Sequence, residues 1–344
     1  MKPKLLLYIG ICIAILSVLC SCKTDDSDPQ NPEVSLSSDR EETYTLIVPP
    51  ESQTGGTMVF SLGLGAPTHF NLGITSGSSV IITGTQLFAS PLRYDDDWNP
   101  QPYLAESWEI SEDGLSITLH LVENAVFHDG APITSEDLAF SVQTVQQNHP
   151  FKSMFAPVIA VDTPDPHTAV IQLSETHPAI LLAMSPPFLP ILPKHIYGDG
   201  QDILTHPANL EPIGSGPFKF VSYEANQRIV LERFEDYFRP GQPYLDRIEF
   251  WLDPDPVSQA VSLKQETAHI SSVYSDLNSL DTLSANDHLL ITRQGFEGIG
   301  PLNWLAFNLL REPLSDVLVR QAIAHAIDMD FITTYMDKGL SQRA

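Results

Sequence analysis

The segment from Leu104 to Ser141, LAESWEISEDGLSITLHLVENAVFHDGAPITSEDLAFS, constrains the fold of this chain more than any other. Apolar residues alternate with polar ones from Leu115 to Leu121, and this period of two predicts a strand with one buried face. His128-Asp129-Gly130 is typical of a turn, although the His and Asp could also be read as a catalytic pair. Thr134, with Asp137 three residues later, then predicts a capped helix. The segment therefore predicts strand, turn and helix in that order.

Three further segments carry strand, turn and loop signals. Residues 57–62 (TMVFSL) predict a strand, which the run from Gly63 to Pro67 ends. The run Asp95 to Asp97 is typical of solvated carboxylates on a loop, although three adjacent acids could also hold a cation. No Gly-Lys-Ser/Thr follows Gly214-Ser215-Gly216-Pro217, so this segment predicts a turn into a strand at residues 218–223 rather than a phosphate-binding loop.

The amino terminus has the order of a secretory signal. Lys2 and Lys4 precede an apolar run at residues 5–19, and Leu19-Cys20-Ser21-Cys22 resembles a bacterial lipoprotein box. The apolar run is shorter than the roughly 20 residues that a membrane-spanning helix needs. We therefore expect a signal peptide at residues 1–21 and a lipid on Cys22 that anchors the protein to a membrane. A plain transmembrane anchor is the alternative.

Residues 22–54 are mostly polar and lack apolar periodicity. They predict a flexible tether between the lipid and the folded part, or equally a merely disordered terminus. Cleavage before Cys22 would remove Cys12 and Cys20, and lipidation would consume the remaining thiol. No disulfide is therefore expected.

Charge and missing motifs exclude several classes of function. A net charge of −25 argues against nucleic acid as a partner, because phosphate binding needs a basic surface. The sequence contains no G-x-S-x-G, H-E-x-x-H, P-loop or paired-cysteine spacing, and its 11 histidines are scattered. We therefore expect no enzymatic activity, no cofactor and no metal centre.

Three long blocks, at residues 104–141, 191–250 and 303–332, resemble the family 5 solute-binding proteins of ABC transporters, the oligopeptide-, dipeptide- and nickel-binding group. The retained positions of the family motifs include Trp108, Asp113, Gly114, Phe127, Asp129, Gly130, Pro132, Thr134, Asp137, Phe140, Ser141, Asn308, Pro313, Asp316, Arg320, Gln321 and Asp328. The resemblance covers residues 55–332, and Ser215, Phe234 and Phe238 stand where the family commonly has Thr, Asn and Trp.

The resemblance implies an α/β protein with the type II periplasmic-binding-protein fold, built from several lobes. Lobe I is expected to be discontinuous, at residues 55–90 and 193–297, with lobe II inserted at residues 91–192. Residues 298–344 would begin a lobe III that is incomplete here, because family members usually continue further. A cleft that lacks one wall is expected to bind its solute poorly.

The resemblance also implies a function. It is that of an extracytoplasmic lipoprotein, in the periplasm or at the cell surface, that captures a small solute and delivers it to the permease subunits of an ABC importer. The solute is expected to be a peptide, and the protein a monomer. Ala66, Pro67, Thr68 and Asn71 are candidate ligand contacts, although this loop also reads as a plain connection between elements. Asn303 and Trp304 are further candidates, and Trp304 could equally be a core residue.

Two other functions stay open at this point. Nickel or a metal chelate could be the solute, although His69 and His128 are too isolated to argue for it. A lipoprotein that acts as a receptor or scaffold without transport would bind no solute with saturable affinity.

Overall fold

The structure is a computed structural model that describes residues 54–95, 97–271, 280–291, 305–339 and 341. Residues 48–328 form one unit, and residues 1–47 with 329–344 form a second, which is treated separately. The expected signal peptide, the lipidation site Cys22 and all but the last residue of the expected tether lie outside the described residues. Within the described ranges, no helix combines the length and the apolar character needed to cross a membrane.

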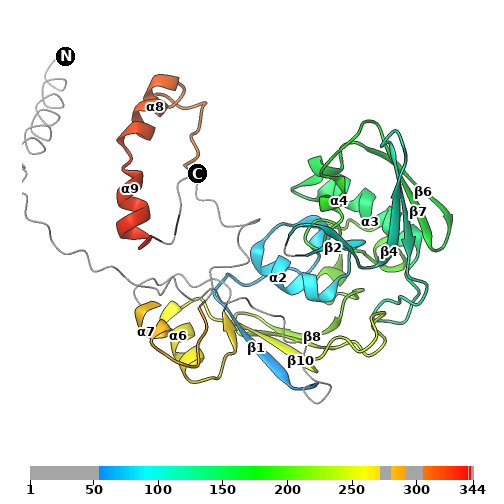
Figure 1. Ribbon diagram of the computed structural model, residues 1–344, viewed down its shortest axis with the longest axis horizontal. Coiled ribbons are helices and arrows are strands. Elements are labelled where there is room, and N and C mark those ends of the chain that lie inside the picture. Colours follow the sequence, from blue (N-terminus) through cyan, green and yellow to red (C-terminus); the bar gives the residue numbers. More distant parts are fainter. Residues whose placement is uncertain (1–53, 96, 272–279, 292–304, 340, 342–344) are drawn as a thin grey trace, which may run out of the picture. The chain divides into compact units, whose positions relative to one another are not determined.

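A four-stranded antiparallel sheet forms from one continuous stretch of chain (Figure 1). Along the sheet the order is β4-β5-β7-β6. The strands are β4 (Ala105–Ile110), β5 (Ser116–Leu121), β6 (Val158–Asp165) and β7 (Thr168–Leu173). Ile117, Leu119 and Leu121 are buried, and the residues between them are half-exposed, as the alternation in the sequence predicts.

Helix α3 (Ser135–Asn148) packs on one face of this sheet and begins where the sequence predicts. One carboxylate oxygen of Asp137 accepts hydrogen bonds from the backbone N–H and the hydroxyl of Thr134, at 2.9 and 3.0 Å. Its other oxygen accepts from the backbone N–H of Lys194 at 2.9 Å. Lys194 is the first residue of the short helix α5 (Lys194–Tyr197), so this buried carboxylate both caps α3 and holds α5.

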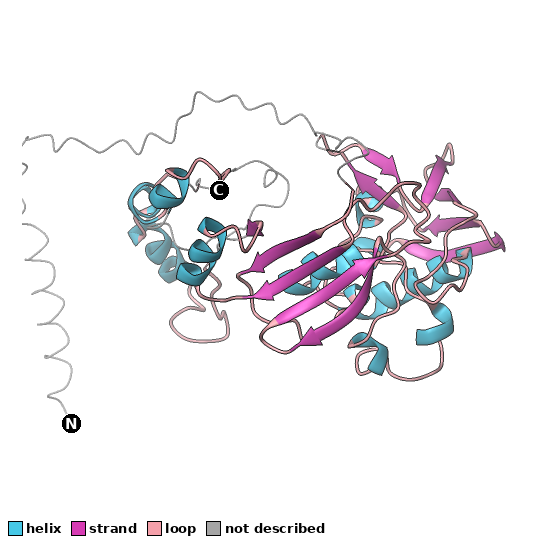
Figure 2. Ribbon diagram, turned by 90° about the horizontal axis from the view of Figure 1, so that it is seen from below, coloured by secondary structure: helices cyan, strands magenta, loops and turns pink. Residues whose placement is uncertain are grey.

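A five-stranded sheet joins segments that are far apart in the sequence, and Figure 2 shows its long strands side by side. The strand order is β11-β1-β10-β9-β8. The strands are β1 (Thr57–Leu62), β8 (Phe218–Glu224), β9 (Arg228–Arg233), β10 (Arg247–Leu252) and β11 (Ile270–Ser271). Strand β1, between β11 and β10, runs parallel to both, with Thr57 opposite Arg247 and Leu62 opposite Leu252. The strands expected at residues 57–62 and 218–223 are confirmed.

One face of the five-stranded sheet carries an apolar core. Leu62 and Phe250 pack there with Val80 and Leu87 of helix α2 (Ser78–Leu87). The opposite face carries charged groups among apolar ones, and Glu249 of β10 there lies 3.9 Å from the guanidinium of Arg228 and opposite Val230 of β9. Residues alternate between buried and half-buried along β10, whereas β9 buries three consecutive residues, Ile229 to Leu231.

The remaining elements are short. In the first unit they are β2 (Leu92–Tyr94), β3 (Pro100–Pro102), η2 (Leu72–Ile74), η3 (Lys152–Phe155), α4 (Ile180–Ala183), η4 (Pro207–Asn209), α6 (Pro256–Lys264), α7 (Leu280–Ser284) and α8 (Val317–Ala326). In the second unit, α9 (Met329–Phe331) continues into η5 (Ile332–Met336). The five-stranded sheet takes β1 from one side of the four-stranded sheet in the sequence and its other strands from the other side. The boundaries of the three lobes stay predictions.

Candidate ligand-binding site

The carboxyl ends of the parallel strands β1, β10 and β11 lie at one edge of the five-stranded sheet. The chain leaves this edge at Gly63 after β1 and at Asp253 after β10. The two exits are neighbours, because the backbone N–H of Asp253 donates to the carbonyl of Leu62 at 3.3 Å. In open α/β sheets, ligands bind outside the carboxyl ends of parallel strands. This edge is therefore the candidate site.

The loop from Gly63 to Asn71 follows β1 and is anchored at its far end. The ring of Phe70 is fully buried and lies 5.1 Å from that of Phe220 and 5.4 Å from that of Tyr223. The hydroxyl of Tyr223 donates to the carbonyl of Pro67 at 3.1 Å. These contacts hold the end of the loop, at Pro67 and Phe70, against the core.

The middle of the same loop has free backbone groups. Within the described part of the chain, the N–H groups of residues 64–66, 68 and 69 form no hydrogen bond. Gly65 and Thr68 are exposed and Ala66 is half-buried, so these amides can meet solvent or a ligand. A Cβ atom added at Gly65 would meet no atom within 4 Å. Unpaired amides on a loop that is held at both ends can bind an extended ligand at little ordering cost.

Asn71 has a clear structural role. Its side chain is fully buried, its oxygen accepts from the N–H of Gly73 at 2.9 Å, and its amide group donates to the side chain of Asn209 at 2.9 Å. These bonds start η2 and hold the loop against the core. The expected ligand contact at Asn71 stays a prediction.

Sequence reasoning missed a polar brace behind the candidate site. Gln259 of α6 is 1% exposed, and its amide group donates to the carbonyl of Asp253 at 2.7 Å. Its oxygen accepts from the hydroxyl of Ser271 at 3.1 Å, so one side chain ties α6 to the ends of β10 and β11. The neighbouring hydroxyl of Ser61 is buried and has no partner among the described residues. No local motif marks Gln259, because its partners come together only in the folded sheet.

The candidate edge carries negative charge. Asp255 caps α6 by accepting from the N–H of Val257 at 3.2 Å, and Asp253 accepts from the N–H of Asp255 at 3.2 Å. His69, in the loop after β1, has a pKa that is lowered by burial, so its ring adds no positive charge near neutral pH. An acidic edge favours the cationic groups of a ligand.

The turn at Gly214 to Gly216 and the side chain of His128 form a seam between distant segments. The Nδ1 of His128 accepts from the N–H of Gly214 at 3.0 Å, and its Nε2 donates to the carbonyl of Gly216 at 3.0 Å. The hydroxyl of Ser215 donates to the carbonyl of Ile191 at 3.0 Å and accepts from the N–H of Ala89 at 2.9 Å. This segment is therefore the expected turn before β8, and its donors and acceptors bind protein.

The seam also decides between the two readings of His128 and Asp129. The Asp129 carboxylate lies 2.8 Å from Nε2 of His195, whereas both ring nitrogens of His128 are used by the Gly214 to Gly216 turn. Burial lowers the pKa of His128 to about 4, against a smaller opposing effect of the hydrogen bond to Gly216. The ring is therefore neutral at pH 7, and its contacts are those of a structural residue.

The aspartate run at residues 95–97 could have held a cation, and Asn303 and Trp304 were the remaining candidate ligand contacts. Asp95 accepts from the N–H of Asn99 and from the side chain of Gln101, both at 2.8 Å, and so closes the turn between β2 and β3. The residues that the structure describes contain no group of three or more His, Cys, Asp or Glu that could hold a metal ion. Asn303 and Trp304 lie outside the described residues, so their expected ligand contacts stay predictions.

The structure is a mixed α/β fold, and its solved structural neighbours are type II periplasmic binding proteins, which confirms the expected fold class. The profile described as "Bacterial extracellular solute-binding proteins, family 5 Middle" matches residues 99–344. This chain belongs to the family 5 extracellular solute-binding proteins, as the resemblance predicted. Members of this family bind solutes and are not catalysts, which agrees with the expectation that the chain is not an enzyme.

Related sequences carry names that refer to different ligands. A Brucella ovis protein named as an ABC transporter peptide-binding protein is 32% identical over 284 residues, which cover 80% of this chain and 52% of that protein. The heme-binding protein A of Haemophilus influenzae is 30% identical over 318 residues, which cover 86% of this chain and 57% of that protein. The chain thus spans about half the length of these curated relatives.

Solved structures give the same picture. The oligopeptide-binding protein AppA from Bacillus subtilis, in complex with a nonapeptide, matches with a TM-score of 0.72 and 26% identity over 83% of this chain and 56% of its own. NikZ from Campylobacter jejuni, in complex with Ni(L-His), matches with a TM-score of 0.69 and 25% identity over 85% of this chain and 56% of its own. The fold is shared by binders of peptides and of a metal chelate.

Proposed function

We propose that this chain is the solute-capturing part of an ABC importer and that its solute is a peptide. The observation that carries the proposal is the loop after β1, where Gly65 and Thr68 are exposed and the N–H groups of residues 64–66 and 68–69 have no partner among the described residues. An extended peptide backbone offers the carbonyl groups that such amides bind. The carboxylates of Asp253 and Asp255 lie at the same edge and suit a cationic amino terminus or side chain.

Ala66, Pro67 and Thr68 are the proposed contacts from this edge, with Asn71 holding the loop in place. Asn303 and Trp304 are proposed contacts from the lobe that begins near residue 298. The protein acts as a monomer, closes its lobes on the peptide and passes it to permease subunits. A ligand favours the closed state when it makes contacts with the protein that form only after the lobes close.

Gly65 allows a direct test, because the space beside it is open. In the full-length protein as its host produces it, Gly65→Phe should fill that space and weaken binding of the probe trialanine at least about tenfold, or 1.4 kcal/mol. Gly65→Ala is the matched control and should bind within about twofold of wild type. Equal binding by both variants in isothermal titration would exclude this edge as the site.

The alternative solutes need a parallel series. The relatives include a heme-binding protein and a structure with Ni(L-His), so nickel–histidine and heme are titrated under the same conditions. Saturable binding of either, without binding of trialanine or of other short peptides, would replace the peptide proposal. Absence of saturable binding for every solute would favour a receptor or scaffold.

The proposed location is the outer side of a membrane, with a lipid on Cys22 as anchor. The basic residues Lys2 and Lys4, the apolar run and the lipoprotein box support this anchor. Cys22→Ala should leave the precursor uncleaved or release the protein from the membrane fraction. Cys20→Ala, two residues earlier, should be processed normally. Normal processing of the Cys22 variant would contradict the proposal.

A further inference from the structure

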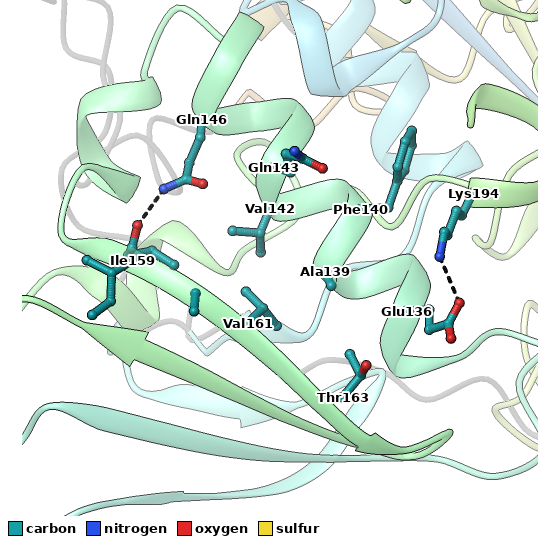
Figure 3. Close-up of a pocket in the computed structure, with 12 residues that line it drawn as sticks. Glu136, Ala139, Phe140, Val142, Gln143, Gln146, Ile159, Val161, Thr163 and Lys194 are labelled. Atoms are coloured by element: carbon teal, nitrogen blue, oxygen red, sulfur yellow. Dashed lines mark hydrogen bonds and ion pairs between the residues drawn. The ribbon is translucent and has the colours of Figure 1, made fainter. Parts of the chain in front are cut away.

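The groove between α3 and β6 has a volume of about 450 Å³, but its two walls are tied together within the chain (Figure 3). At one end the amide of Gln146 donates to the carbonyl of Val158 at 2.8 Å. At the other end the hydroxyl of Ser135 donates to the carbonyl of Asp165 at 2.6 Å. These contacts serve the packing of α3 on β6. A cluster with unused donors lies elsewhere, beside the short hairpin of β2 and β3.

Arg239 lies on a rigid aromatic platform next to this hairpin. Its guanidinium carbon is 5.4 Å from the centre of the Tyr103 ring, and one of its N–H groups donates to the carbonyl of Pro102 at 3.2 Å. The rings of Tyr103 and Tyr237 lie 5.6 and 4.6 Å from that of Phe238, which belongs to the buried core. A guanidinium has five N–H donors, so most of those of Arg239 remain available.

Arg93 of β2 is the second positive group of the cluster. The residue is exposed, and its guanidinium forms no hydrogen bond or ion pair within the described part of the chain. Burial lowers the pKa of Arg93 and the positive charge of Arg239 lowers it further, whereas Tyr103 and Tyr237 raise it. The two guanidinium groups therefore lie within electrostatic range of each other, and the two tyrosines lie close to both.

This arrangement differs from that of other arginines in the chain. Arg228, for example, lies 2.8 Å from the carboxylate of Glu224. Neither Arg93 nor Arg239 has such a partner among the residues that the structure describes, although the sequence contains 43 acidic residues against 18 Lys and Arg. Two like charges without a counter-charge repel, and an anion bound between them would remove that cost.

A hydroxyl group adds a neutral donor. Tyr237 donates to the hydroxyl oxygen of Tyr103 at 3.0 Å, so the proton of the Tyr103 hydroxyl is left for another acceptor. Burial raises the pKa of Tyr103, against smaller opposing effects of the hydrogen bond from Tyr237 and of the two arginines. The phenol therefore stays protonated at neutral pH and can donate to an anion.

We propose that Arg93, Arg239 and the hydroxyl of Tyr103 bind a phosphate group, on residues that the edge proposed for the solute does not use. Two guanidinium groups match the charge of nearly −2 on a phosphate at neutral pH, and their planar N–H groups pair well with its oxygens. A single carboxylate would compensate only one arginine. The phosphate belongs either to a free anion in solution or to a lipid headgroup.

The test titrates the full chain with inorganic phosphate at constant ionic strength. The side-chain N–H signals of Arg93 and Arg239 in the NMR spectrum should shift together, with one dissociation constant of about 1 mM or below. Acetate should bind at least about tenfold more weakly, because it carries a single charge. A short-chain phosphatidic acid, used below micelle formation, separates the two sources. Tighter binding than that of inorganic phosphate would identify a lipid headgroup, and equal or weaker binding a free phosphate.

Arg93→Gln should weaken phosphate binding at least about tenfold. The matched control is Arg228→Gln, which removes the same charge from an arginine that has an acidic partner and should bind phosphate within about twofold of wild type. Three results would each overturn the proposal. They are no saturable binding of phosphate, equal binding of acetate, or an equal effect of the two substitutions, which would assign binding to overall charge. A shift of only one arginine signal would also overturn it, and that measurement uses wild-type protein.

Discussion

The two sheets of this protein are built from the chain in different ways. The four-stranded sheet forms from residues 105–173, and its neighbouring strands are all antiparallel. The five-stranded sheet pairs β1 with β10 in parallel, so its centre forms only after distant segments meet. Loop closure costs more for distant segments. We therefore expect the first sheet to be determined locally and the second to depend on the contacts that hold its segments in place.

The seam formed by His128 and the Gly214 to Gly216 turn contains such contacts between distant segments. The turn directly precedes β8, and its partners include Leu87, Ala89 and Ile191, which flank the segment that carries the four-stranded sheet. Changes at the seam should therefore destabilise the five-stranded sheet more than the four-stranded one. Two background variants report on the two sheets separately. One keeps only Trp108 of β4 as its tryptophan, and the other keeps only Trp251 of β10.

Gly214→Ala should have the largest effect. A Cβ at this position would lie 1.9 Å from the carbonyl oxygen of Leu87, and backbone atoms cannot move aside cheaply. We expect a loss of at least about 4 kcal/mol in the free energy of unfolding, the range reserved for severe steric or packing defects. Urea unfolding followed at Trp251 measures it.

The matched control is Gly65→Ala, where the added methyl group meets nothing within 4 Å. Its urea midpoint should stay close to that of wild type. If Gly214→Ala shifts the Trp108 and Trp251 transitions equally, the two sheets unfold as one unit and the contrast between them fails.

Protonation of His128 should have the next largest effect. Its pKa is lowered from 6.5 to about 4, chiefly because burial removes the ring from water; Lys219 lowers it further, and Asp129 raises it. The unfolded chain then binds the proton more tightly than the native state. The stabilisation is complete above pH 6.5 and is lost as the pH falls toward 4, by about 3 kcal/mol in total.

The measurement is urea unfolding at a series of pH values between 7 and 4. Burial also lowers the pKa of His149, so wild type alone does not isolate the seam. His128→Gln removes the titrating group, and its stability should fall less steeply over this pH range than that of wild type. Parallel curves for the two proteins would assign the pH dependence to other groups.

Ser215→Ala should have a smaller effect at the same seam. The hydroxyl is fully buried and makes two hydrogen bonds, to Ile191 and Ala89, so its removal leaves a carbonyl and an N–H without this partner. The expected loss is about 1–3 kcal/mol. Ser258→Ala, on the exposed surface of α6, is the control and should be neutral. An unchanged free energy of unfolding for Ser215→Ala would mean that water reaches the seam and replaces the hydroxyl group as hydrogen-bond partner.

Local sequence patterns predicted some elements of each sheet, although β6, β7, β10 and β11 were not predicted. The alternation over Leu115 to Leu121, the cap at Thr134 and the strand at residues 57–62 are all present in the structure. Short-range signals suffice for these elements, because their buried faces and caps are encoded within a few residues. The pairing of β1 with β10 was not predicted, since no local pattern specifies a distant parallel partner; the family resemblance implied only that residues 55–90 and 193–297 share a lobe.

The candidate site was predicted less completely than the fold. The loop from Ala66 to Thr68 does lie at the carboxyl edge of the parallel strands. Gln259, which braces that edge, carries no sequence signal, because its contacts with Asp253 and Ser271 exist only in the folded protein. His128 was recognised as a turn residue, yet its two bonds to the Gly214 to Gly216 turn join segments that no local pattern connects.

Lys194→Ala should change the free energy of unfolding least, although Lys194 also lies at a contact between distant segments, that of α5 with α3. Its ammonium group pairs with Glu136 at 2.8 Å, but both side chains are at least half exposed, and water and salt screen such pairs. Its backbone N–H, which donates to the buried carboxylate of Asp137, is retained in the variant. We therefore expect no resolvable shift in the urea midpoint, and a double-mutant cycle with Glu136→Ala should give no coupling at 0.5 M salt. A clear loss of stability in Lys194→Ala would mean that the exposed ion pair, and not the buried carboxylate of Asp137, holds α5 against α3.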